Sequence, residues 1–126
     1  MDIGAEFTTE SLIALGNEAS SLLCAGDIDR LADRFGYALA YGREKSAAIS
    51  EDLRRCLAEL GATEFVPRAE HASVSVKYFA SNDTGLRALV ECLVPNVGSG
   101  GLLLELVVTG NGDNGYLTLE DISVAV

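Results

Sequence analysis

The chain has 126 residues, of which 48% are hydrophobic and 22% charged, a length and composition typical of one globular domain and not of a disordered or fibrous chain. Its 19 acidic residues outnumber its 9 Lys and Arg, giving a net charge of −10 that disfavours nucleic-acid binding, which requires clustered cations. We therefore expect a single domain spanning residues 1–126.

The opening segment is acidic and has no basic stretch followed by an apolar one, so the pattern predicts no secretory signal. No apolar run approaches the roughly 20 residues of a membrane span. We expect a cytoplasmic protein without membrane contact. Cys24, Cys56 and Cys92 lie in apolar patterns and form no C-x-x-C pair, which predicts buried thiols and not metal ligands or nucleophiles.

The first half of the chain shows apolar residues at helical spacing in three consecutive segments, between about residues 8 and 61. Small polar residues suited to helix N-caps precede these segments, and glycines suited to helix ends follow them. The expected caps and ends are, in chain order, Thr8 or Thr9 and Gly26, Asp27 and Gly42, and Ser50 and Gly61.

From Ala72 onward the period changes to two, which is typical of strands with one buried face. Turn-forming residues at 81–85, 95–101 and 111–115 separate four such runs and favour hairpins. The alternation slips at Glu120–Asp121, which predicts a β-bulge. Helices followed by strands indicate an α+β fold, with two to three helices (about 8–61) packed on one face of a four-stranded antiparallel meander (about 72–126).

None of the local motifs predicts catalysis, a metal site or a cofactor site. The Asp-Thr-Gly triplet at 83–85 is a single copy, whereas aspartic-protease chemistry needs two carboxylates. The loop at 111–115 lacks a correctly spaced Glu for calcium, and the glycines at 98–101 precede a strand and no phosphate-binding helix. His71 has no relay partner nearby in sequence. We expect no enzyme and no cofactor, while a carboxylate pair assembled by folding stays open.

The sheet face turned away from the helices is the feature that points to a function. In a meander this face carries apolar residues among acids, and no Lys or Arg follows Arg87. Apolar anchors with acidic surroundings are typical of a surface that binds a basic protein. The candidate contact residues are Leu89, Glu91, Leu93, Glu105, Glu120 and Asp121, with Asp27, Asp29 and Asp33 as a second acidic candidate.

Two other interpretations of this face stay open at this point. The chain between Gly61 and Ala72 could cover it as ordinary core, or it could join two copies of the chain in a homodimeric structural module.

Four segments carry a resemblance to a known group of proteins: Leu23–Leu31, Ile49–Arg54, Leu102–Leu106 and Tyr116–Val124. They resemble a family of small bacterial proteins similar to immunity proteins of contact-dependent inhibition and related polymorphic-toxin systems. The resemblance implies a cytosolic protein that binds a cognate toxin domain, commonly a basic nuclease or RNase, and blocks it. It identifies no contact residues, because immunity proteins differ widely in fold.

The helix-then-sheet order and the stretch Ala25–Asp29 also resemble NTF2-like domains. That resemblance implies a conical pocket that binds a small molecule or hosts an enzyme. Such folds insert a strand and a helix between the early helices and the main sheet, and the usual pocket acids and histidine are not evident here. Toxin binding is therefore the leading hypothesis, and an NTF2-like small-molecule site is the alternative.

Overall fold

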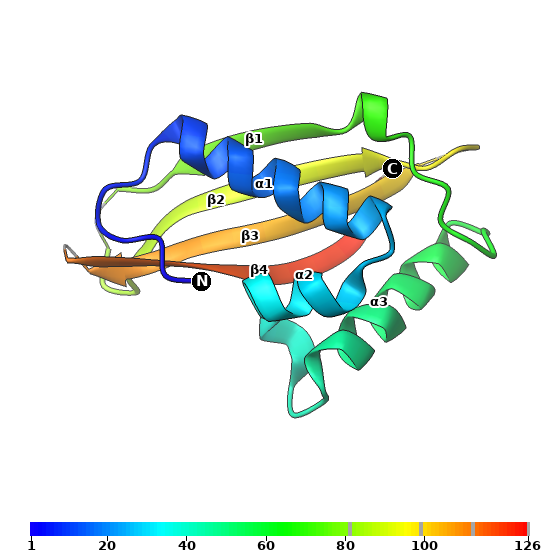
Figure 1. Ribbon diagram of the computed structural model, residues 1–126, viewed down its shortest axis with the longest axis horizontal. Coiled ribbons are helices and arrows are strands. Elements are labelled where there is room, and N and C mark those ends of the chain that lie inside the picture. The colour runs from blue at the N-terminus through cyan, green and yellow to red at the C-terminus, as the bar shows by residue number, and fades with distance from the viewer. Residues whose placement is uncertain (81, 99, 112, 126) are drawn as a thin grey trace.

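The computed structural model describes residues 1–80, 82–98, 100–111 and 113–125 (Figure 1). Three α-helices come first, α1 (Thr9–Cys24), α2 (Ile28–Phe35) and α3 (Lys45–Glu59), with the short 3₁₀ turns η1 (Ala38–Ala40) and η2 (Ala69–His71). Four strands follow, β1 (Ser73–Tyr78), β2 (Leu86–Pro95), β3 (Gly101–Asn111) and β4 (Asn114–Ala125). The predicted α+β order of helices and then strands is confirmed.

The strands form one antiparallel sheet in the order β1-β2-β3-β4, which confirms the predicted meander. Ser81, Ser99 and Gly112, one in each predicted turn, lie outside the described residues. Figure 1 shows the three helices on the same face of the sheet, with α1 running across β1 and β2 and the pair α2 and α3 beside β4. The opposite face, here called the outer face, carries no helix of the described chain.

The core lies between the helices and the inner face of the sheet. Alternate residues of β2, β3 and β4 are fully buried there, as period-two alternation requires. They pack against Leu12 and Leu23 of α1 and Phe35 of α2. Gly16 lets α1 approach closely, because a Cβ at that position would lie 2.7 Å from Cγ1 of Val74.

The first helix begins and ends as predicted, with Thr8 accepting a hydrogen bond from the Ser11 amide and Gly26 in a left-handed conformation after the last turn. The predicted bounds of the other two helices need correction. α2 ends at Phe35, well before Gly42, because Gly36 takes a φ of +70° and stops the helix. Asp27 does occupy the N-cap position of α2, but its side chain makes no capping bond.

α3 begins at Lys45, six residues before Glu51, which would be the first helical residue after a Ser50 cap. The Glu44 carboxylate caps it by accepting hydrogen bonds from the amides of Ser46 (3.1 Å) and Ala47 (2.8 Å). Ser50 is therefore an interior residue, and Asp52 belongs to the middle of the helix and not to its first turn.

Two bulges interrupt the ladder of the described strands. Glu105 pairs with Asp121 and Leu106 with Leu119, so Glu120 is the extra residue and the predicted bulge is confirmed. A second bulge, which the sequence pattern did not predict, makes Arg87 the extra residue of β2. Strict alternation would place Arg87 on the same face as Leu89, but the bulge breaks the alternation, and the guanidinium lies over the ring of Phe7, with 4.7 Å from Cζ to the ring centroid.

The segment between Gly61 and Ala72 does not cover the outer face. It passes around one end of the sheet, where Pro67 pairs with Asn96 and the Arg68 amide donates to the Pro95 carbonyl. Phe65 packs against the helix-side core. Leu93 on the outer face consequently keeps 37% of its surface exposed.

Candidate functional site

The register of the strands arranges the outer face as three rows that run across the sheet. The middle row is Ser75, Glu91, Glu105 and Asp121, each directly opposite the next on the neighbouring strand. The flanking rows place Leu89 opposite Val107 and Leu93 opposite Leu103. The face is therefore a band of acid between two apolar pairs, and it brings together all six outer-face residues predicted from sequence, with Glu120 as the bulged neighbour of Asp121.

The acidic row has little compensating charge. Lys77 pairs with Glu91, with 3.2 Å between Nζ and Oε1, and among the described residues it is the one cation that forms an ion pair with the row. Burial raises the pKa of Glu105 above its ordinary value, and the neighbouring charges of Asp121, Glu91 and Glu120 raise it further. Burial also raises the pKa of Asp121. Like charges directly opposite each other in a sheet are destabilising, so this row lowers the stability of the free protein.

The second acidic candidate lies elsewhere. Asp27, Asp29 and Asp33 are exposed residues at the start of and along α2, on the helix side of the sheet. Asp27 approaches Arg30 at 4.0 Å. The fold does not join these three carboxylates to the outer-face row, which makes them a separate surface.

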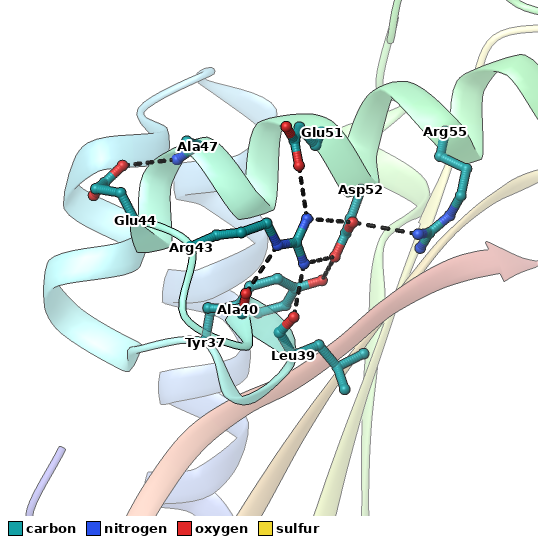
Figure 2. A network of polar contacts seen from close by, with 9 residues as sticks. All are labelled: Tyr37, Leu39, Ala40, Arg43, Glu44, Ala47, Glu51, Asp52 and Arg55. Atoms are coloured by element: carbon teal, nitrogen blue, oxygen red, sulfur yellow. Dashed lines mark hydrogen bonds and ion pairs between the residues drawn. The ribbon is translucent and has the colours of Figure 1, made fainter.

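One buried carboxylate was not identified as a site from sequence. Asp52 of α3 is 4% exposed and lies at the centre of a polar network that joins α3 to the loop after α2 (Figure 2). Its Oδ2 accepts from the Tyr37 hydroxyl (2.5 Å) and from Nη2 of Arg43 (3.4 Å). Its Oδ1 accepts from Nη1 of Arg43 (3.2 Å) and Nη1 of Arg55 (3.3 Å).

These contacts make Asp52 a structural anchor. Each carboxylate oxygen already accepts from two donors, which leaves little capacity for a substrate. Burial by itself raises the pKa of Asp52, but the hydrogen bonds from Tyr37 and Arg43 and the charges of Arg43 and Arg55 outweigh it, so the pKa is lowered. The Arg43 guanidinium also donates to the carbonyls of Leu39 (2.7 Å) and Ala40 (2.8 Å). The network therefore holds the loop against α3.

The thiols show the burial expected from sequence for Cys56 and Cys92, while Cys24 is half-buried. Burial raises the pKa of Cys92 to about 11, and its Sγ lies 3.6 Å from the Gly16 carbonyl oxygen. Such a thiol stays protonated at neutral pH. Within the described residues, no group of His, Cys, Asp and Glu side chains has an arrangement that could hold a metal ion. None of the described helices is both long and apolar enough to span a membrane.

Comparison with protein-family models, with curated proteins and with solved structures finds no match to this chain.

Replacing Asp52 tests the anchor. Asp52→Asn keeps the side-chain size but leaves the Arg43 guanidinium without its buried counter-charge, and we expect a loss of about 2–3 kcal/mol in the free energy of unfolding. Glu51 bonds the same guanidinium from an exposed position (2.8 Å), so Glu51→Gln is the matched control, with an expected loss of about 1 kcal/mol or less. Urea unfolding at pH 7 measures both, and equal losses would contradict the anchor role.

Replacing Glu105 tests the strain in the acidic row. A raised pKa means that the folded state binds the proton more tightly than the unfolded chain, so ionised Glu105 lowers stability at neutral pH. This penalty disappears as the pH falls through the raised pKa toward the ordinary value of about 4.3. Glu105→Gln should therefore raise stability at pH 7 by about 0.2–1 kcal/mol and by progressively less on acidification.

Glu64→Gln is the control for this experiment, since Glu64 is exposed in a loop and forms no ion pair with a described residue. Its unfolding free energy should follow the unsubstituted protein at every pH. A Glu105→Gln protein that is less stable than the unsubstituted protein at pH 7 would show that the row is not repulsive.

Proposed function

We propose that this protein is a cytosolic immunity protein that binds a cognate toxin domain of basic charge, a nuclease or RNase, and neutralises it by covering its active site. The observation that carries the proposal is the outer face, on which Glu91, Glu105 and Asp121 form a continuous row between exposed and half-buried leucines. The resemblance found in the sequence suggests the class of protein, and the outer face is the surface that we propose binds the toxin domain.

The spacing of the row suits a nuclease partner. Neighbouring strands lie about 4.8 Å apart, so the carboxylates of Glu91, Glu105 and Asp121 present a linear array of negative charge. The active site of a basic nuclease attracts a phosphate backbone through clustered cations, and a row of carboxylates meets the same cations. Charge complementarity of this kind steers association and fixes orientation.

The apolar pairs on either side of the row offer a partner the hydrophobic contact that the carboxylates do not provide. Leu93 opposite Leu103, and Leu89 opposite Val107, can be dehydrated by a partner, and such central apolar contacts carry much of the affinity of protein interfaces. A bound cation would also relieve the repulsion that raises the pKa of Glu105. The apolar contacts and the relief of repulsion at Glu105 therefore both favour binding.

The NTF2-like alternative receives no support from the inner face. A conical pocket needs open space between helices and sheet, but Leu104, Leu106 and Leu119 are fully buried there against the helices. The carboxylate that could have served acid/base chemistry, Asp52, is saturated by its donors.

A charge reversal with a matched control tests the binding surface. Glu105→Lys with Glu120→Lys should weaken binding of the toxin domain at least about ten-fold at low salt and reduce its salt dependence, because the attraction is lost. Asp29→Lys with Asp33→Lys raises the net charge equally but alters α2, and should leave affinity within about three-fold. Calorimetry at two salt concentrations measures both.

A toxin gene immediately upstream of the gene for this chain would supply the partner for this test, and its toxin domain would be expressed together with the chain. Growth rescue and a purified complex are the expected results. Failure to rescue growth or to form a complex would overturn the immunity function. If the chain rescues growth but both double variants lose the same affinity, the proposed binding surface is wrong and the immunity function stands.

A further inference from the structure

A cleft of about 540 Å³ lies at the end of the sheet where the N-terminal segment passes the connection between β1 and β2. Its walls come from Phe7 of that segment, from Tyr78 and Phe79 at the end of β1, and from Leu86 and Arg87 at the start of β2. In Figure 1 this is the end at which the segment before α1 turns around the strand ends. A volume of this size is in the range of sites for small molecules.

The walls of the cleft are held in place by hydrogen bonds. The Asn82 amide nitrogen donates to the carbonyls of Ala80 (2.9 Å) and Leu86 (2.8 Å), which ties Asn82 to the start of β2. The hydroxyls of Thr9 and Tyr78 lie 2.7 Å apart and tie the start of α1 to the end of β1. The cleft is therefore largely pre-formed, as small-molecule sites usually are.

Arg87 is the one charged residue among the described residues that line the cleft. Its guanidinium stacks on Phe7, but no described residue accepts a hydrogen bond from it or forms an ion pair with it, and Nη1 is buried without a partner. Arg34, Arg43 and Arg55, by contrast, all pair with carboxylates. In a chain with 19 acidic residues, a half-buried arginine without an acid is an unused anion-binding group.

We propose that this cleft binds a small monocarboxylic acid with a flat apolar body, its carboxylate on the Arg87 guanidinium and its body among Phe7, Phe79 and Leu86. The planar fork of a guanidinium matches a carboxylate in a two-point contact. The net charge of −10 disfavours anions of higher charge, such as phosphate esters, since the field of the whole protein repels them. This site is separate from the outer face and does not depend on the toxin-binding proposal.

The test is an NMR titration of the full chain with phenylacetate and, as a neutral analogue of the same shape, phenylacetamide. Phenylacetate should bind in the millimolar range and shift the amide signals of Phe79, Arg87 and Gly110, while phenylacetamide binds at least about ten-fold more weakly. A third titration uses N-acetylglycylphenylalanine, whose carboxylate is the C-terminus of a peptide. Tighter binding of this peptide than of phenylacetate identifies a chain terminus as the source of the carboxylate, and weaker binding identifies a free acid.

Two variants distinguish binding of phenylacetate in the cleft from a general effect of the cations of the protein. Arg87→Met keeps the apolar stem and should weaken phenylacetate binding at least about ten-fold, whereas Arg54→Met removes an exposed cation of α3 and should leave it unchanged. Arg87→Lys should give an intermediate affinity if Arg87→Met does not fold. Equal binding of phenylacetate and phenylacetamide to the unsubstituted protein, or absence of binding of both, would overturn the proposal without any variant.

Discussion

The register of the antiparallel sheet is the constraint on which the rest of the molecule depends. Side chains alternate strictly along a strand, so the pairing that buries Leu104 and Leu106 under the helices also fixes what lies between them on the other face. That residue is Glu105, and the same pairing sets Glu91 and Asp121 on either side of it. Hydrophobic burial on one face thereby imposes electrostatic repulsion on the other.

This repulsion is tolerable because stability comes from the other side of the sheet. The inner face is closed by three helices, and the α2–α3 connection is fastened by Arg43 and the buried Asp52. The bulge at Glu120 lets Ile122 return to the core after two consecutive acidic residues. We propose that a partner supplies the cations that this acidic row lacks.

Much of the fold could be predicted from the sequence because its signals are periodic. The change from helical spacing to alternation marks where the sheet begins, and the slip at Glu120–Asp121 marks the bulge. The outer-face acids followed directly, since residues two apart on a strand share a face. Their alignment into a single row needed the register, which the sequence alone does not give.

Other features could not be predicted, for physical reasons that differ. The β2 bulge leaves no trace, because Arg87 continues an unbroken alternation and only its pairing reveals it. α3 starts early because a glutamate caps it, whereas the preferred N-cap residues are Ser, Thr, Asp and Asn. The Asp52 network and the Arg87 cleft join residues of separate elements, and no local pattern encodes such contacts.

Carboxylate footprinting of the complex with the toxin domain tests the central claim most directly. Carbodiimide-mediated labelling, followed by mass spectrometry, reports the accessibility of each acidic side chain with and without the partner. If the toxin domain binds the outer face, Glu91, Glu105, Glu120 and Asp121 should lose reactivity in the complex. Asp29 and Asp33 should keep theirs. Protection of Asp29 and Asp33 with unchanged labelling of the outer-face row would contradict it.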